Sequence, residues 1–397
     1  MDDVRSIAKD LDDIAASPSP CAAGRSIWVL VDGRSGDDAQ IIRIARALGW
    51  PYQLVQAKRG IPELIAGRAQ DFFGTFPPKP SALPPDSSWP DLLLAAGGRN
   101  VSFARRVKAA SGGKTRIVFL GAPYARLADF DLIVTTAQWR LPTLPNVLHT
   151  LLPLNWPETE ALDAAAERWR PELADLPRPW LCVAVGGTST SFFLRPADAA
   201  RLAAHINDIC RETGGAALIT TSRRTPAEVA DALANGLTAP HRLYRWRPND
   251  DANPYLGFLA LADRYLVTNE SASMIADALQ TGRPVDLFAL PQRPVSRFLI
   301  QERIVGRDGP DSSQYLGDGL ADRFRRWLIV NGLWTPARNM PRLARILTER
   351  GLLGPRPAAK DETAPLVAPC ETDLQRTCER IGELFPRTSK PLSRPAG

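Results

Sequence analysis

The stretch "PWLCVAVGGTSTSFFLR", residues 179–195, decides the fold because it joins a buried strand to a glycine turn and a run of hydroxyl side chains. Its first half, "WLCVAV", is the continuous apolar run that is typical of a central strand in a parallel sheet. The strand breaks at Gly186 and Gly187, and Thr188 and Ser189 follow. Such a loop fits a phosphate cradle or an ordinary helix cap. The position of the loop in the chain is therefore needed to decide between a phosphate cradle and a helix cap.

The chain after this loop alternates between helical and strand patterns as far as residue 290. We predict helices at 196–213, 225–236, 253–263 and 271–282, and strands at 215–222, 241–246, 264–269 and 284–290. Alternation of this kind predicts a parallel sheet covered by helices on both faces. The stretch at 179–195 therefore opens a Rossmann-like domain.

A first series of the same kind precedes it. The pattern predicts a strand, a glycine turn and an amphipathic helix in 26–50, followed by strands at 91–96, 115–121 and 131–136. We predict an α/β protein with two Rossmann-like, doubly wound domains facing across a cleft. The expected division is a flexible leader (1–24), a first domain (25–155), a hinge (156–178), a second domain (179–352) and a mobile tail (353–397).

Composition excludes several classes of protein. The net charge of +6 arises from 49 basic residues dispersed among 43 acidic ones, which favours anionic small molecules or a membrane surface over nucleic acid. The five cysteines form no CxxC pair, so neither a disulfide framework nor a zinc site is expected. The acidic N-terminus lacks a signal peptide, and no apolar run is long enough to span a membrane. We expect a cytoplasmic protein, free or peripheral on the inner face of the cytoplasmic membrane.

Ligands of doubly wound folds bind beyond the carboxyl ends of the strands, so the loops that follow the strands hold the candidate residues. After the first strand, Gly36 allows close approach to a helix N-terminus, and Asp37 is a candidate general base; a plain turn with a capped helix is the alternative. After the strand at 91–96, Gly98, Arg99 and Asn100 can orient an acceptor, or form a turn with a solvated arginine.

The second domain offers a nucleotide site. The loop of Gly186, Gly187, Thr188 and Ser189, together with an arginine pair after the next strand, predicts a diphosphate clamp. A later strand leads through a polar turn into a helix whose first turn can hold phosphate and whose carboxylate can bind ribose. The arginines are Arg223 and Arg224, and the residues of this last unit are Asn269, Ser271, Ser273 and Asp277.

Taken in order, these motifs resemble the GT-B glycosyltransferases, in which a strand-SxS-helix-carboxylate-G-x-P unit holds the nucleotide of a nucleotide-sugar. The match falls on Ser271, Ser273, Asp277, Gly282 and Pro284. More narrowly, the chain is similar to the plant elongated-mitochondria fission factors and their bacterial relatives over about residues 26–290. The motifs are "WVLVDGRSGDDAQ", "PDLLLAAGGRN", "LLPLNW", "VAVGGTS", "TTSRRTP" and "VTNESASMIADALQTGRPV".

The resemblance implies a GT-B fold and a metal-independent glycosyltransferase with no permanently bound cofactor. A nucleotide-sugar, UDP-linked or another NDP-sugar, would be the donor, and a small molecule or a lipid-linked or envelope glycan the acceptor. The plant member is similar to a mitochondrial-surface adaptor for a dynamin-related GTPase, a role that does not transfer to a chain of bacterial composition. The alternatives are a sugar-nucleotide epimerase or hydrolase, and a non-catalytic GT-B adaptor at a membrane surface.

Histidine and aromatic residues give weaker indications. Related transferases often carry a histidine base in the first loop, where this chain has Asp37. Of the three histidines, His149 borders the expected cleft, whereas His205 and His241 suit structural positions. The proline-rich section 60–90 carries aromatic side chains that pack on their own domain or contact a membrane. These aromatic residues are Phe72, Phe73, Phe76 and Trp89.

Overall fold

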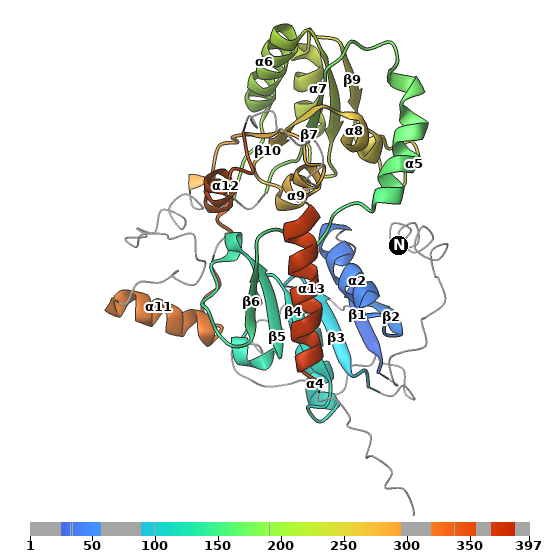
Figure 1. Ribbon diagram of the computed structural model, residues 1–397. Helices are drawn as coiled ribbons and strands as arrows, with labels where there is room; N and C mark the ends of the chain where they lie inside the picture. The colour runs from blue at the N-terminus through green and yellow to red at the C-terminus, as the bar shows by residue number, and fades with distance from the viewer. Residues whose placement is uncertain are drawn as a thin grey trace, which may run out of the picture.

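The computed structural model describes two parallel sheets, one above the other along the molecule (Figure 1). The described residues are 25–31, 33, 35–56, 89–98, 100–189, 191–294, 319–336, 338–354 and 367–385.

The first sheet has six strands in the order β2-β1-β3-β4-β5-β6. Every pairing is parallel, and β1, β3, β4 and β5 are almost entirely buried. The strands are β1 (Ile27–Val31), β2 (Tyr52–Gln56), β3 (Leu92–Ala96), β4 (Arg116–Leu120), β5 (Leu132–Thr136) and β6 (Val147–Thr150). The two edge strands, β2 and β6, are absent from the prediction. The strand β2 is half exposed and carries polar residues, and β6 is only four residues long, so the long apolar run that predicts a central strand is missing in both.

The second sheet has five strands in the order β11-β10-β7-β8-β9. The strand β7 (Trp180–Val185) from the opening stretch lies in its centre, which explains its continuous apolar sequence. The other strands are β8 (Ala216–Thr221), β9 (His241–Tyr244), β10 (Arg264–Thr268) and β11 (Val285–Phe288). Two Rossmann-like domains, as predicted from the alternation, are confirmed.

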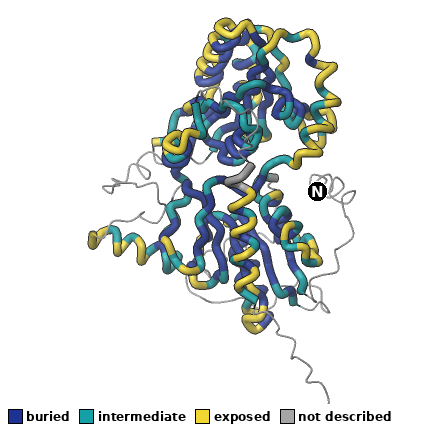
Figure 2. Tube along the Cα trace, viewed as in Figure 1, coloured by how far each residue is buried: buried dark blue, intermediate teal, exposed yellow. Residues whose placement is uncertain are grey.

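Helices flank each sheet. In the first domain these are α2 (Ser35–Leu48) and α4 (Val101–Ala110), with short 3-10 turns η1 (Leu127–Asp129) and η2 (Ala137–Trp139). In the second they are α6 (Pro196–Thr213), α7 (Ala227–Gly236), α8 (Tyr255–Leu261) and α9 (Ala272–Gln280). The chain then forms α11 (Leu320–Val330) and α12 (Met340–Glu349). Each sheet is buried beneath its helices (Figure 2).

The segment predicted as a hinge contains α5 (Thr159–Trp169), followed by η3 (Pro171–Leu173). The ring of Trp169 lies 6.1 Å from that of Phe258 on α8. A Cβ at Gly257 would lie 2.4 Å from the Cδ1 of Trp169, so the absence of a side chain there lets the tryptophan dock. The helix α5 therefore packs on the second domain.

The prediction of a mobile tail is wrong for residues 367–383, which form α13 (Val367–Glu383). This helix lies against the first domain (Figure 1). Ile381 and Thr377 are fully buried, and Asp373 accepts a hydrogen bond from the amide of Leu151 at 2.8 Å. The charged residues of the tail suggested disorder, but three of them, Glu371, Arg376 and Glu379, lie on the exposed face of this amphipathic helix.

Candidate functional site

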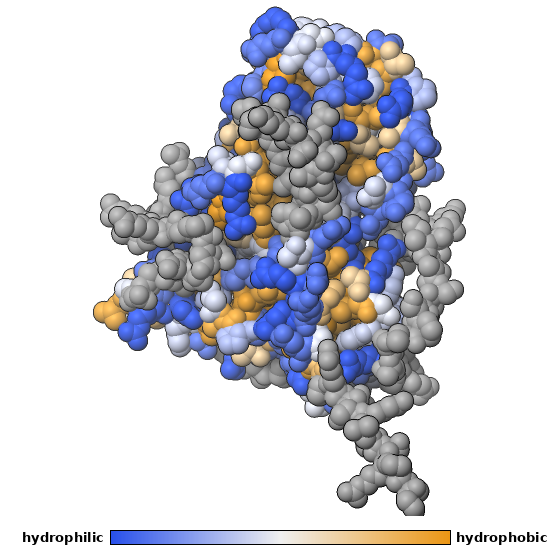
Figure 3. All heavy atoms as spheres, viewed as in Figure 1, coloured by the Kyte–Doolittle hydropathy of each residue, from blue (hydrophilic) through white to orange (hydrophobic). Residues whose placement is uncertain are grey.

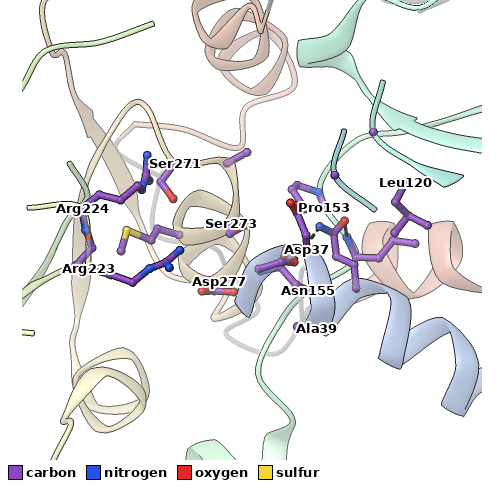
Figure 4. A pocket seen from close by; sticks show the side chains of 18 of the residues that line it. Asp37, Ala39, Leu120, Pro153, Asn155, Arg223, Arg224, Ser271, Ser273 and Asp277 are labelled. Atoms are coloured by element: carbon purple, nitrogen blue, oxygen red, sulfur yellow. Dashed lines mark hydrogen bonds between the residues drawn. The ribbon is translucent and has the colours of Figure 1, made fainter. Parts of the chain in front are cut away.

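The strand orders place the loops singled out from the sequence at the two switch points of the sheets. In the first sheet, β1 and β3 lie side by side and their connections run in opposite directions; in the second sheet, β7 and β10 do so. A switch point leaves a crevice at the carboxyl ends of the strands, where doubly wound folds bind ligands. Here both crevices open into one cavity of about 1780 Å³. The loops that carry the candidate residues therefore face each other across one interdomain cleft (Figure 4).

The glycine pair at the end of β7 makes room for two other residues. A Cβ at Gly186 would lie 1.6 Å from the Oε1 of Glu270, and one at Gly187 would lie 2.1 Å from the carbonyl oxygen of Arg224. The amide of Gly187 donates to Oε1 of Glu270 at 2.9 Å, and that of Gly186 to the hydroxyl of Thr268 at 2.9 Å. The paired glycines thus let the loops after β8 and β10 close on β7.

Glu270 is a site residue that the sequence analysis did not single out. Its side chain is fully buried and lies 3.2 Å from the guanidinium of Arg224. Burial raises the pKa of this carboxyl, while Arg224 opposes the shift. Its Oε2 has no hydrogen-bond partner among the described residues. A carboxyl in a polar turn directly after a strand was the available signal, but its burial against the glycine pair depends on the fold.

Hydroxyl groups in the loop after β7 accept hydrogen bonds from backbone amides of the same loop. The hydroxyl of Ser189 accepts hydrogen bonds from the amides of Ser191 and Phe192, at 3.3 and 3.1 Å. The hydroxyl of Thr188 accepts from the amide of Leu194 at 3.3 Å. Both residues line the cleft. As an acceptor, Ser189 keeps its own proton for donation to a ligand.

Two helix N-termini meet across the cleft. A Cβ at Gly36, in the first turn of α2, would lie 3.1 Å from the hydroxyl of Ser273, in the first turn of α9. Ser271 is the N-cap residue of α9 and is buried, although its side chain makes no capping hydrogen bond. The first amides of each helix lack intrahelical partners, and both macrodipoles present their positive ends here. An anion between the domains would be stabilised by both.

Asp277 lies one turn further along α9 and faces the same cleft (Figure 4). The hydroxyl of Tyr255 donates to its Oδ2 at 2.7 Å. Burial raises the pKa of Asp277 to about 7, against the opposing effects of this hydrogen bond and of Arg43 on α2. Arg43 itself pairs with Glu158 at 2.8 Å. An acid from one domain is thus coupled to a cation from the other.

The two aspartates at the start of α2 have different positions. The Oδ2 of Asp38 accepts from the amide of Gly33 at 2.9 Å and the side chain is buried, so it closes the turn after β1. Asp37 lines the cleft on the wall opposite Asp277 (Figure 4). Gly98 also lines this wall, where the ring of Tyr124 lies within 2.6 Å of the position that a Cβ would occupy.

Four of the predicted binding residues that the structure describes do not line the cleft: Gly186, Gly187, Asn100 and Asn269. Asn100 is fully buried, and its amide donates to the carbonyls of Leu30 and Ala96 at 3.1 and 2.9 Å, which ties β1 to β3. The side chain of Asn269 accepts from the amide of Leu290 at 3.1 Å. Buried amide groups in polar turns satisfy the backbone of neighbouring loops, which the sequence pattern does not distinguish from ligand binding. Arg99 lies outside the described residues, as do Phe72, Phe73 and Phe76; Trp89 packs on its own domain, 6.1 Å from Trp28.

The cleft is rich in arginine. Among the described residues, seven arginines and four carboxylates line it. Arg223 and Arg224 lie on the second-domain wall (Figure 4). The imbalance favours an anionic ligand. The remaining arginines are Arg43, Arg106, Arg247, Arg293 and Arg338, and the acids are Asp37, Asp250, Glu270 and Asp277.

Arg338, from the segment before α12, lines the cleft but was not among the residues predicted from the sequence. Its guanidinium donates to the Oε1 of Gln138 at 2.9 Å and lies 5.5 Å from the ring of Trp139. Electrostatic interactions also join it to Asp37 and Glu270, which belong to different domains. No spacing in the sequence relates residue 338 to either loop, so only the fold brings it to the centre of the cleft.

The histidines are structural or peripheral to the cleft. His149 lies on β6 and does not line the cavity; burial and Arg342 lower its pKa to about 4. His241 contacts the carbonyl of Ala239 at 2.8 Å, and the ring of His205 lies 6.2 Å from that of Phe288. Within the described ranges there is no group of three or more metal-binding side chains. In the same ranges, none of the helices has the length and apolar character needed to cross a bilayer.

Two Rossmann-like domains with a shared cleft at their switch points define a GT-B-like fold. The chain belongs to the mitochondrial fission ELM1 family, whose model matches residues 35–303. The mitochondrial fission protein ELM1 of Arabidopsis thaliana is 27% identical over 218 residues, which are 49% of this chain and 51% of that protein. The chain therefore matches about half the length of this plant relative.

A second relative is the uncharacterized protein RP120 of Rickettsia prowazekii, 23% identical over 67% of this chain and 84% of that protein. Among solved structures, the lipopolysaccharide outer core galactosyltransferase WaaB is 11% identical with a TM-score of 0.40, over 91% of this chain and 100% of that one. The UDP-GlcNAc 2-epimerase of Neisseria meningitidis is 11% identical with a TM-score of 0.39, over 83% of this chain and 100% of that one.

Proposed function

We propose that this protein is a metal-independent glycosyltransferase that moves a sugar from a nucleotide-sugar to an acceptor held by the first domain. The observation that carries the proposal is the cleft formed at both switch points, which is lined, among the residues that the structure describes, by seven arginines against four carboxylates. A diphosphate leaving group needs this surplus of positive charge when no metal neutralises it.

The second domain would hold the donor. Arg223 and Arg224 would bind the diphosphate, with the hydroxyl of Ser189 and the first amides of α9 as further donors. Glu270 would position Arg224 through their 3.2 Å ion pair without contacting the ligand. Asp277 would accept hydrogen bonds from the ribose hydroxyls. It already accepts one hydrogen bond from the hydroxyl of Tyr255.

The first domain would hold the acceptor. Asp37 would take the proton of the attacking hydroxyl, since it lies on the wall opposite the donor residues. Gly36 and Gly98 would let the acceptor approach the backbone. Arg338 takes the orienting role expected of Asn100, because its guanidinium lines the cleft whereas the amide of Asn100 is turned into the domain.

A nucleotide-binding measurement tests this proposal. Thermal shifts of the full chain with UDP-, GDP-, ADP- and CMP-sugars should show stabilisation by one nucleotide class. Asp277→Ala should weaken that binding, whereas Asp208→Ala, in an exposed ion pair on α6, should leave it unchanged. Equal affinity in the Asp277 variant would overturn the assignment of the donor site.

Two further outcomes separate the alternatives. Sugar inversion or hydrolysis without an acceptor would identify an epimerase or hydrolase. Absence of binding by any nucleotide would favour a non-catalytic platform. One observation supports that second candidate: Arg224 and Asp277 are already engaged by Glu270 and Tyr255 within the protein.

A further inference from the structure

The helix α11 presents an apolar stripe to solvent. Leu320, Phe324 and Trp327 are 83%, 61% and 52% exposed, and they recur at the i, i+4 and i+7 spacing that places side chains on one face. The rings of Phe324 and Trp327 are stacked, with centroids 6.0 Å apart and an interplanar angle of 14°. Leu333, just beyond the helix, adds a further apolar side chain at 43% exposure.

The orientation of α11 is set by its C-terminal end. Ile329, on the opposite side of the helix from the apolar stripe, is buried in the first domain. A Cβ at Gly332 would lie 2.4 Å from the backbone of Ala125, so this turn is tightly docked. The guanidinium of Arg326 donates to the carbonyl of Thr143 at 3.3 Å. The other end of the helix projects from the body (Figure 1).

This arrangement reverses the usual amphipathic pattern. A surface helix normally turns its apolar face to the core, yet here the stripe of two aromatics and a leucine points outward. Apolar atoms gather at the free end of the helix (Figure 3). One flank of the stripe is basic, since Arg323 and Arg326 lie on it; Arg325 lies on the other side of the helix and pairs with the single acid Asp322 at 3.9 Å.

We propose that α11 docks into the interface of an anionic lipid bilayer. Phe324, Trp327 and Leu320 would enter the boundary between headgroups and acyl chains, and Arg323 would contact lipid phosphates. The exposed aromatic side chains match the apolar interior of a bilayer, and the neighbouring arginine matches its negative headgroups. We therefore propose a membrane as the partner in place of a protein. With 11 residues, the helix lies in the plane of the interface and does not span it.

Docking through α11 would bring the first-domain side of the cleft, where we propose that the acceptor binds, near the membrane. The base of the helix packs on Ala125 and Arg126, directly after Tyr124, whose ring lines the cleft beside Gly98. An acceptor carried by a lipid could therefore enter the first domain from the bilayer. This inference goes beyond glycosyl transfer and does not depend on it, because lipid binding and nucleotide binding are measured separately.

Co-sedimentation of the full chain with vesicles tests the proposal. We expect binding to vesicles of phosphatidylglycerol and phosphatidylcholine, and weaker binding to phosphatidylcholine alone. Phe324→Ser combined with Trp327→Ser should reduce the partition coefficient by about tenfold or more. The matched control is Tyr52→Ser, which changes an aromatic side chain of 38% exposure on the edge strand β2 and should bind like the wild type.

A charge variant separates the two contributions. Arg323→Glu should weaken binding to anionic vesicles and leave the binding to neutral ones unchanged, whereas Arg211→Glu, on the exposed surface of α6, should change neither. All of these side chains are exposed, so equal melting temperatures will show that the variants fold.

Three results would overturn the proposal: no vesicle binding by the wild type, undiminished binding by the double variant, or a loss of self-association in that variant without a loss of lipid binding. The last would identify a second copy of the chain as the occupant. Nucleotide thermal shifts on the same variants report on the donor site independently.

Discussion

Replacing Asp277 by asparagine should stabilise the protein at pH 8 and have little effect at pH 4. Burial raises the pKa of this carboxyl from 3.8 to about 7 in the folded protein, so folding favours the protonated form. The sign follows from linkage: an acid with a raised pKa costs nothing when both states are protonated, below about pH 4, and the cost grows as the pH rises to about 7. The charged carboxylate therefore destabilises the native state most at neutral and alkaline pH.

The magnitude follows from the size of the shift. A difference of about 3 pKa units at about 1.4 kcal/mol per unit gives about 4 kcal/mol. This is an upper bound, because Asp277 retains partial exposure to the cleft and Arg43 partly compensates its charge. Asparagine does not titrate, and its carbonyl oxygen can still accept the hydrogen bond from Tyr255, which is 2.7 Å from the carboxylate. The variant should therefore avoid most of the cost without leaving the hydroxyl of Tyr255 unpaired.

Chemical and thermal unfolding of the wild type and of Asp277→Asn at pH 4, 6 and 8 would measure the effect. In a domain of this size each kcal/mol corresponds to about 2–4 °C, so the gap at pH 8 should be on the order of 10 °C in the transition of the second domain. Asp208→Asn, at an exposed ion pair, should show little difference at any pH. A variant that is no more stable than the wild type at pH 8 would refute the reasoning.

Three further changes test the site. Gly186→Ala would place a Cβ 1.6 Å from the Oε1 of Glu270 and should lower the free energy of unfolding by about 1–3 kcal/mol. The control Gly382→Ala, which has open space around it in α13, should raise the free energy of unfolding slightly, and equal urea midpoints for the two variants would contradict this reasoning. Asn100→Ala removes two buried hydrogen bonds and should cost about 1–3 kcal/mol in urea unfolding with nucleotide affinity unchanged, and the reverse pattern would return Asn100 to the binding site. Arg223→Gln should raise the Kd for inorganic pyrophosphate by about tenfold or more in calorimetry, and an unchanged Kd would remove this residue from the diphosphate site.

The local pattern of the sequence was sufficient for the fold class. The apolar runs that became β7 and β3 are buried on both faces, so they could be recognised without knowledge of their neighbours. The order of βα units then implied parallel sheets, because consecutive parallel strands need a helical crossover. Strands at the edges escaped this logic, since β2 is half exposed and β6 is short.

The candidate site was predictable only in part. The loops after the strands were located correctly because the carboxyl ends of parallel strands share one edge of the sheet. The direction of each side chain within those loops was not: Asp37 lines the cleft, whereas the neighbouring Asp38 and the nearby Asn100 hold backbone groups. Residue type and spacing alone do not distinguish a polar side chain that lines the cleft from one that hydrogen-bonds to the backbone.

What the sequence determined by itself is the content of each βα unit, the two-domain plan and the family, because these depend on periodicity and on motifs within a few residues of one another. What only the tertiary structure decided is which groups meet. The pair of glycines in "VGGTSTS" accommodates Glu270 and Arg224, Arg338 arrives from a distant segment, and α11 turns its apolar stripe outward. Each of these depends on non-local packing, which fixes the neighbours of a side chain after its local structure has formed.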